Sequence, residues 1–257
     1  MNFSKKTVMI TGAVRNTGLA IAKEFAAAGA NIILNGRKDS DVKRVADALR
    51  KDYGVEVLEA CADIAVEKEV DRVFDSLEKQ NIKLDVLVNN AVVQAVGYSF
   101  VDTPLDVLEN AFKINVFGLF HCAQRAAKMM IAQGGGSIVN IGSNTAIRPV
   151  KKRTAYVATK GAAASLTRAM AIDLAEYNIR VNMVIAGYIN SDRWPKLAKE
   201  DIERRHKNIP LGHECMGKDI ARGVLFLASD ESPRTTGSSI LIDGGCTTQL
   251  VPTDCDV

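Results

Sequence analysis

Tyr156 and Lys160 are residues whose types and spacing could carry chemistry in this chain. They lie four residues apart in an alanine-rich run, 154–177, that predicts a helix, so both side chains lie on one helical face. A tyrosine hydroxyl titrates near about pH 10, and an ammonium group one turn away favours the phenolate and lowers this pKa. Such a tyrosine can act as general acid or base between an alcohol and a carbonyl. Taken alone, the common spacing is more simply explained as a pair on a helix surface.

A glycine-containing turn, 11–18, follows the first apolar run of the chain. Gly12 allows a tight turn, and Gly18 lets the following helix pack closely against the strand. Backbone N–H groups at the start of that helix then face a bound pyrophosphate. The turn therefore predicts a dinucleotide site, with a plain strand–helix connection as the alternative.

The elements that must position these residues alternate between strand and helix along the chain. Strands are predicted at 7–10, 31–35, 55–60, 84–89, 137–141, 179–184 and 239–242. Helices are predicted at 17–28, 41–52, 66–80, 104–133, 154–177 and 218–229. This alternation, with right-handed crossovers, predicts one α/β domain over residues 1–257: a doubly wound parallel sheet of the Rossmann type in three α/β/α layers.

The composition excludes several classes of function. The 257 residues are 47% hydrophobic and 25% charged with a net charge of +3, which is too little for a nucleic-acid footprint. No apolar run approaches the roughly 20 residues that span a bilayer, and no signal peptide is recognised. The five cysteines and three histidines lack metal-ligand spacing. We expect free thiols, no metal and no membrane or nucleic-acid partner, in a reducing cytoplasm.

Five motifs in order resemble those of the short-chain dehydrogenase/reductase family. They are the turn 11–18, Asn89-Asn90-Ala91, Asn115, Ser143 with Tyr156 and Lys160, and the closing run Leu241-Ile-Asp-Gly-Gly. The resemblance extends over roughly residues 5–250 and is nearest to the 3-oxoacyl reductase branch. It implies hydride transfer between a nicotinamide cofactor and a carbonyl or carbinol carbon.

The resemblance also assigns roles to four residues as a catalytic set. Tyr156 exchanges the proton with the substrate oxygen, and Lys160 lowers its pKa and holds the nicotinamide ribose. Ser143 donates a hydrogen bond to the substrate oxygen in the manner of an oxyanion-hole donor. Asn115 anchors a water in a proton relay. The alternative for Asn115 is local hydrogen bonding, which asparagines within helices often make.

The cofactor is expected to be NADP(H). NAD-preferring relatives place an aspartate at the end of the second strand, and that position here is Gly36, followed by Arg37. Arg15 in the phosphate loop and Arg37 could bind a 2′-phosphate, or they could be solvated surface residues. Asp63 resembles an adenine-contacting aspartate, with a helix N-cap as its alternative. The expected cofactor residues are Gly12, Arg15, Asn16, Gly18, Arg37, Asp63, Asn89, Ala91, Tyr156, Lys160, Gly187, Ile189 and Ser191.

Four residues depart from the family pattern near the cofactor, one of them Ser191, which stands where a threonine is common. Asn16 replaces the middle glycine of the phosphate loop, Val92 replaces the glycine after Asn-Asn-Ala, and Ala186 replaces a proline before Gly187. Asparagine tolerates left-handed backbone angles, so the turn at Asn16 can be kept. The departures at Asn16, Val92 and Ala186 motivate a second hypothesis, in which the chain is a non-catalytic nucleotide-binding sensor or scaffold.

The substrate side is less specific. The polar segment 188–217 is expected to form a substrate lid, in which Trp194 either anchors the lid or packs on the substrate. Residues 92–98 are expected to line the opposite wall. The basic loop before Tyr156 suits a carboxylate, a phosphate or an acidic carrier protein, or it is a solvated surface. Its basic residues are Arg148, Lys151, Lys152 and Arg153. Acyl thioester, sugar or polyol, keto acid and steroid-like ketone all remain open as small-molecule substrates.

Helices 104–133 and 154–177 carry more apolar and small residues than one buried face needs. The examples in the first helix are Phe117, Phe120, Ala123, Ala127 and Met130. Members of the resembled family pair these two helices across a two-fold axis. The resemblance therefore implies a homo-oligomer, either a dimer or a tetramer.

Overall fold

Short apolar runs form a seven-stranded parallel sheet in the order β3-β2-β1-β4-β5-β6-β7. The structure is a computed structural model, and it describes residues 1–255. The strands are β1 Thr7–Ile10, β2 Asn31–Gly36, β3 Val57–Cys61, β4 Val86–Asn89, β5 Gly136–Ser143, β6 Ile179–Ala186 and β7 Ser239–Ile242. Each neighbouring pair is parallel, and the order changes direction between β1 and β4. The predicted doubly wound sheet is confirmed.

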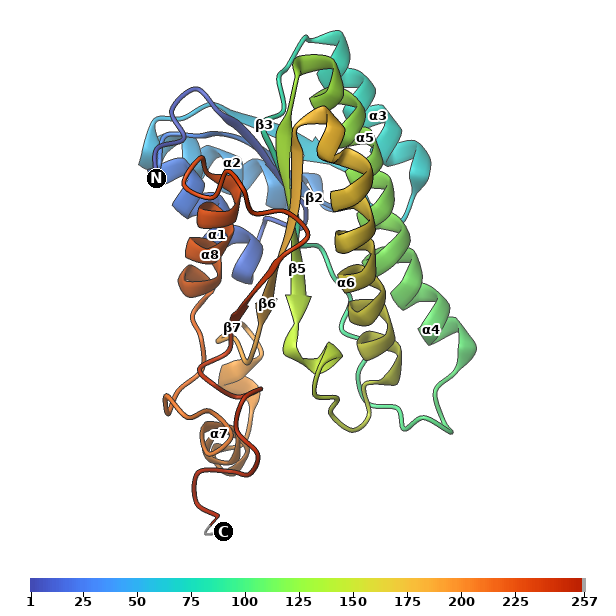
Figure 1. The fold of residues 1–257 in the computed structure, drawn as a ribbon, viewed down its shortest axis with the longest axis vertical. Helices are drawn as coiled ribbons and strands as arrows, with labels where there is room; N and C mark the ends of the chain where they lie inside the picture. Colours follow the sequence, from blue (N-terminus) through green and yellow to red (C-terminus); the bar gives the residue numbers. More distant parts are fainter. Residues whose placement is uncertain (256–257) are drawn as a thin grey trace.

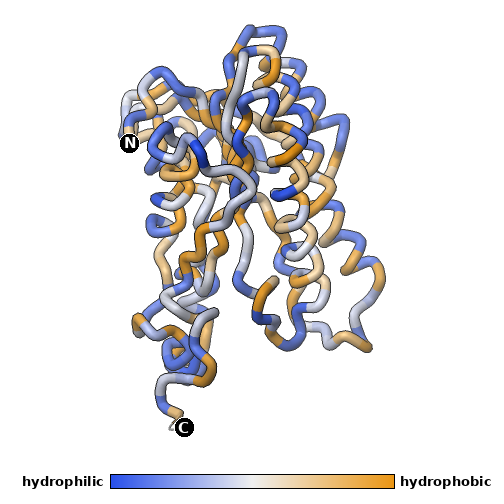
Figure 2. The backbone as a smooth tube through the Cα atoms, in the orientation of Figure 1, coloured by the Kyte–Doolittle hydropathy of each residue, from blue (hydrophilic) through white to orange (hydrophobic). Residues whose placement is uncertain are grey.

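Helices cover both faces of the sheet, which gives the three predicted layers. In Figure 1, α1, α2 and α8 lie on one face, and α3, α5 and α6 lie on the other. The helices are α1 Asn16–Ala27, α2 Asp39–Tyr53, α3 Glu67–Lys79, α4 Leu105–Phe112, α5 Leu119–Gln133, α6 Thr154–Leu174, α7 Lys199–His206 and α8 Gly217–Ala228. Because both faces are covered, the central strands are apolar on both sides, as in Ile32, Ile33 and Leu34. Figure 2 shows these hydrophobic strands, in contrast to the mostly hydrophilic α7.

The long helix expected at 104–133 is divided into three parts. Between α4 and α5 the chain forms a π-helical segment, η1 Lys113–Gly118, that contains Asn115. Short π-helical segments within α-helices are frequent at functional sites. Ala123, Ala127 and Met130 are buried in the core, so the surplus of apolar residues expected on this helix is wrong for these three.

The carboxyl ends of the strands meet at one edge of the sheet, toward the bottom of Figure 1. The turn after β1 and the loops after β4, β5 and β6 all lie there. Helix α7 and the C-terminal end of the described chain lie beyond this edge, where β6 leads into segment 188–217. In a doubly wound sheet, ligands bind at this edge, near the point where strand order reverses. Across residues 1–255, none of the helices combines the length and apolar character that crossing a membrane requires.

Candidate active site

Ser143 and Tyr156 come together from two neighbouring elements. Ser143 is the last residue of β5, and Tyr156 lies in the first turn of α6; both are buried. The Ser143 hydroxyl is within hydrogen-bonding reach of the Tyr156 hydroxyl, and this interaction lowers the pKa of Tyr156. The same hydroxyl lies 2.9 Å from Thr145 Oγ1 and accepts a hydrogen bond from the Thr145 N–H, which fixes its position. A substrate oxygen between the two hydroxyls would have a proton donor on each side.

Lys160 lies one helical turn beyond Tyr156, and its side chain is buried beneath the tyrosine ring. Its Nζ donates a 2.6 Å hydrogen bond to the main-chain carbonyl of Ile141 in β5. The same Nζ lies 5.8 Å from the centroid of the Tyr156 ring. An ammonium group has three donor protons, so the bond to Ile141 leaves two for a ligand.

Asn115 connects η1 to both walls of the site. Its amide accepts from the Val93 N–H at 2.8 Å, and it donates to the Val93 carbonyl and to Thr159 Oγ1 at 2.9 and 3.0 Å. Thr159 in turn donates to the Tyr156 carbonyl at 2.8 Å. The amide therefore holds the loop after β4 and the turn of α6 that carries Tyr156. The alternative in which Asn115 bonds only within its own helix is wrong.

The net electrostatic effect on Tyr156 differs from the sequence prediction. Burial raises the pKa of Tyr156, and this effect exceeds the lowering by the Ser143 hydroxyl and by the charges of Arg153 and Arg193. The net lowering of this pKa that the sequence predicted is therefore outweighed by burial, and the role of Lys160 toward Tyr156 stays a prediction. The physical reason is that Tyr156 is almost fully enclosed, while the Lys160 ammonium is directed to the Ile141 carbonyl.

Lys160 itself gives a pH-dependent prediction for folding stability. Burial lowers its pKa from 10.5 to about 8. Between these two values the unfolded chain holds a proton that the folded chain has released, so stability rises with pH in this window. Lys160→Met removes this titrating group. As the pH rises from about 8 to 10.5, the free energy of unfolding of the wild type should therefore rise relative to that of the variant by up to about 3 kcal/mol.

Urea unfolding of both proteins at pH values below and above this window measures the difference. Lys128→Met, at an exposed lysine on α5, is the control and should follow the wild type. A constant difference between wild type and Lys160→Met would show that Lys160 titrates as an ordinary lysine.

The phosphate loop is held by side chains from β2 and from the end of β4. Gly12 has φ +62°, and its N–H donates to Asn35 Oδ1 at 3.1 Å. Asn90 Nδ2 donates to the Thr11 and Gly12 carbonyls at 2.9 and 3.1 Å. A Cβ at Gly18 would lie 2.5 Å from the same Asn90 nitrogen. The loop thus needs both glycines, and it leaves the start of α1 open to a phosphate.

Asn90 and Thr11 hold the phosphate loop in place, and sequence reasoning did not single them out. Thr11 Oγ1 accepts from the N–H groups of Asn90 and Ala91 at 3.0 Å each, which joins the end of β1 to the end of β4. The motif Asn89-Asn90-Ala91 contained the signal. However, the side chain of Asn89 lies inside the sheet, where it donates to Asn140 Oδ1 at 3.0 Å.

The departures from the family pattern leave the loop geometry intact. Asn16 adopts φ +48°, the left-handed conformation that its predicted tolerance allows. Its Oδ1 accepts the Asp192 N–H at 3.0 Å, which connects the phosphate loop to segment 188–217. Val92 is exposed, and Ala186 completes the buried pairing of β6 with β7.

The end of β2 leaves no room for an aspartate side chain at Gly36 without movement of its neighbours. A Cβ at Gly36 would lie 2.7 Å from Val14 Cγ1 and 2.9 Å from Val42 Cγ2. Arg37 is exposed, with Nη1 3.8 Å from Asp63 Oδ2, and Arg15 is exposed at the start of α1. Asp63 Oδ1 accepts the Ala65 N–H, whereas the N-cap of α3 is Val66, so the N-cap alternative for Asp63 is wrong.

Gly187, Ile189 and Ser191 follow β6 at the same edge of the sheet. A Cβ at Gly187 would lie 2.5 Å from the Asp243 Cβ, so the chain can turn here only with glycine. Ile189 pairs with Cys215 in an isolated bridge, and the Ser191 carbonyl accepts the Trp194 N–H at 2.8 Å. The hydrogen bond from the Asp192 N–H to Asn16 Oδ1 holds the segment after β6 against the phosphate loop.

Comparisons with known proteins agree with this geometry. The family model described as Enoyl-(Acyl carrier protein) reductase matches residues 12–247. An NAD-dependent glycerol dehydrogenase from Listeria innocua is 34% identical over 250 residues, which cover 96% of this chain and 95% of that protein. The chain belongs to the short-chain dehydrogenase/reductase family.

Further members show the breadth of this family of oxidoreductases. A 3-oxoacyl-(acyl-carrier-protein) reductase from Aquifex aeolicus is 31% identical over 240 residues, 93% of this chain and 96% of that protein. The structure of a gluconate 5-dehydrogenase from Burkholderia cenocepacia in complex with NADP and tartrate matches with a TM-score of 0.92. It is 30% identical, and the match covers 97% of this chain and 98% of that chain. The predicted family is confirmed, and its members use NAD or NADP.

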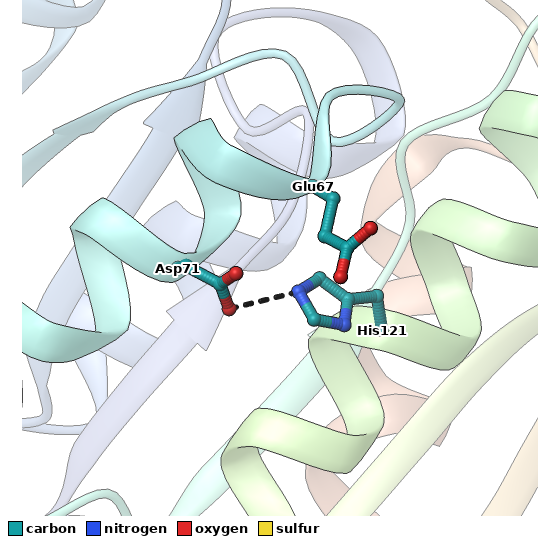
Figure 3. A group of neighbouring side chains, drawn as sticks. All are labelled: Glu67, Asp71 and His121. Carbon is teal, nitrogen blue, oxygen red and sulfur yellow. Dashed lines mark hydrogen bonds and ion pairs between the residues drawn. The ribbon is translucent and has the colours of Figure 1, made fainter.

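One cluster in this short-chain dehydrogenase/reductase, between α3 and α5, has ligand types that a metal could use. Figure 3 shows Glu67, Asp71 and His121, whose ligand atoms lie within 4.8 Å of one another. His121 Nε2 lies 3.0 Å from Asp71 Oδ1, and Arg125 Nη1 donates to the same oxygen at 2.6 Å. Because Asp71 is already engaged by two partners and Glu67 is exposed, an ion-pair network between α3 and α5 explains the cluster. The expectation of no metal stays a prediction.

Proposed function

We propose that the chain is an NADP(H)-dependent oxidoreductase that interconverts a carbonyl group and a secondary alcohol. The observation that carries the proposal is the meeting of the Ser143 hydroxyl, Tyr156 and the buried Lys160 ammonium at the carboxyl edge of the sheet. A bound nicotinamide supplies or accepts the hydride. The chain supplies the proton, the hydrogen bonds and the positions of the reacting groups.

Each residue of the set has a distinct role in this proposal. Tyr156 donates its proton to the substrate oxygen during reduction and removes it during oxidation. Ser143 donates a hydrogen bond to the same oxygen. Lys160 directs its two remaining protons to the ribose hydroxyls of the cofactor. Asn115 positions the turn that carries Tyr156 and, as the family implies, anchors a relay water.

The non-catalytic sensor is less well supported. Its motivation was the bulk of Asn16, Val92 and Ala186 near the cofactor. Asn16 fits the loop in a left-handed conformation, Val92 faces solvent, and Ala186 lies in β6. A sensor would also have no use for an enclosed tyrosine between a serine hydroxyl and a buried lysine.

NADP(H) is preferred over NAD(H) in this proposal because of the charges beside the adenosine ribose. Arg37 directly follows the end of β2, and Arg15 precedes α1. The space around Gly36 excludes an aspartate side chain, which would repel a 2′-phosphate. Guanidinium groups in this position form charge-assisted hydrogen bonds with phosphate oxygens.

Cofactor titration followed by turnover tests the proposal. NADPH should bind more tightly than NADH, and Arg37→Ala should weaken NADPH binding about tenfold or more while leaving NADH binding unchanged. The panel for NADPH oxidation contains ketones, 3-oxoacyl thioesters, keto acids and ketosugars. Arg44→Ala, at an exposed arginine on α2, is the matched control. Preference for NADH, or equal effects of Arg37→Ala on both cofactors, would reject the NADP(H) assignment.

We further propose that segment 188–217 forms a lid over the edge of the sheet where Ser143 and Tyr156 lie. We also propose that the chain forms a homo-oligomer. Phe117 and Phe120 remain 60% and 45% exposed on η1 and α5, and Ile172 is 79% exposed on α6. A second copy of the chain would remove these side chains from water. Sedimentation velocity should therefore give the mass of a dimer or tetramer, and Phe117→Glu should shift it toward the monomer. A monomeric wild type would contradict the proposal.

A further inference from the structure

The loop before Tyr156 contains four basic residues, and one of them faces the catalytic tyrosine. Lys151 and Lys152 are exposed. Arg148 donates to the main-chain carbonyls of Thr247, Gln249 and Leu250, which occupies its guanidinium. Arg153 is half-buried, and its Cζ lies 5.8 Å from the centroid of the Tyr156 ring. Of the four basic residues in this loop, Arg153 is therefore the candidate for binding an anion.

Segment 188–217 brings two further arginines toward the same place. Arg205 Cζ lies 5.5 Å from the ring centroid of Tyr188 and 5.3 Å from that of Trp194. The positive charges of Arg193 and Arg205 act on Arg153 and, together with burial, lower the pKa of Arg153. Trp194 is itself buried, so it anchors this part of the segment. A bound anion would offset the repulsion between these guanidinium groups.

The protein provides no such anion nearby. Over residues 1–255, no Asp or Glu oxygen lies within 4.0 Å of a nitrogen of the half-buried Arg153 or Arg205. By contrast, Arg125 and Arg50 pair with acidic residues. The hydrogen-bond partner of Arg153 Nη1 is the neutral Gln94 Oε1, at 2.6 Å. Gln94 fixes one edge of the guanidinium and leaves its charge uncompensated, beside the hydroxyl that reacts.

We propose that the substrate is a short hydroxy or oxo acid, and that Arg153 binds its carboxylate with Arg205 completing the site from the lid. The inference rests on the proposed function, because it places the reacting carbon against Tyr156. A guanidinium recognises a carboxylate through two parallel hydrogen bonds, which fixes orientation as well as position. The short span from Arg153 to the Tyr156 ring places the carboxylate within a few bonds of the carbinol carbon.

Paired substrates test this proposal. Each short hydroxy acid is compared with the neutral alcohol that has a hydroxymethyl group in place of the carboxylate, with the NADP⁺-loaded full-length protein. The acid should show the higher kcat/KM by at least about tenfold. Arg153→Gln should lower kcat/KM for the acid about 10- to 100-fold, mainly through KM, and should lower it far less for the neutral alcohol, which is affected only through the Arg153 charge beside Tyr156. Arg153→Lys should give an intermediate loss, and Lys151→Gln, at an exposed neighbour, should have no effect.

Calorimetric titration of the acids into the NADP⁺-loaded protein separates this proposal from the proposed function. Acid binding that depends on Arg153 without hydride transfer would support the carboxylate site and contradict the oxidoreductase. Turnover that favours neutral polyols, acyl thioesters or phosphorylated ketoses over the acids would overturn the carboxylate site alone. If Arg153→Gln kept the preference for acids, the role of Arg153 in binding the carboxylate would be overturned. A large loss of NADPH affinity in Arg153→Gln would overturn this role as well. Absence of acid binding to the wild type would likewise overturn the carboxylate site.

Discussion

Tyr156→Phe is expected to lower kcat about 10³-fold while leaving NADPH affinity nearly unchanged. General acid or base catalysis contributes about 10²- to 10⁴-fold, and the substitution removes only the hydroxyl. The ring, which packs between the Lys160 ammonium and the Arg153 guanidinium, is retained. Burial of Tyr156 means that solvent cannot replace the missing proton donor.

Stopped-flow measurement of NADPH oxidation, combined with fluorescence titration of NADPH, separates turnover from binding. Tyr177→Phe, at a tyrosine 40% exposed beyond the end of α6, is the matched control and should retain wild-type kinetics. Undiminished kcat in Tyr156→Phe would show that another group transfers the proton. Equal losses of turnover and cofactor affinity would instead assign Tyr156 a purely binding role.

Gly18→Ala has the second-largest expected effect, a loss of NADPH affinity of about 100-fold. The added methyl group would lie 2.5 Å from Asn90 Nδ2, which bonds the carbonyls of Thr11 and Gly12. Relieving that overlap moves either the start of α1 or Asn90, and either movement displaces the N–H groups that face the phosphate. Losing two such hydrogen bonds corresponds to about 2–3 kcal/mol, and the overpacked contact costs a further 1–3 kcal/mol or so in stability.

Fluorescence titration measures the affinity, and urea unfolding measures the stability. Gly161→Ala is the control, since its Cβ meets no atom within 4 Å and the residue lies within α6. It should retain affinity and gain helix stability. NADPH binding by Gly18→Ala at wild-type strength would mean that the turn 11–18 is not the phosphate site.

Much of this fold was predictable because both faces of the sheet are covered. Buried strands such as β2 are continuous apolar runs bounded by Gly29 and Gly36, so they stand out in the sequence. The candidate catalytic set was also visible, since Tyr156 and Lys160 share a helix face and Ser143 ends a strand. These signals are local in the sequence and come from residue type and spacing alone.

Interactions between distant segments could not be predicted in the same way. Arg148 was grouped with Arg153 by sequence, yet it binds the chain near residue 249, a contact that only tertiary structure reveals. The direction of the Tyr156 pKa depended on how deeply the ring is enclosed, which spacing to Lys160 does not report. The π-helical turn around Asn115 likewise depends on partners in the loop after β4 and in α6.

The hydrogen bond from the Asp192 N–H to Asn16 Oδ1 predicts that cofactor binding and substrate binding are coupled. It places the phosphate loop and segment 188–217 in direct contact, so a ligand that repositions one also repositions the other. Such coupling is reciprocal in free energy. We therefore expect cofactor and substrate to change each other's affinity by the same factor, which titrations of NADPH with and without substrate, and of substrate with and without NADPH, would measure.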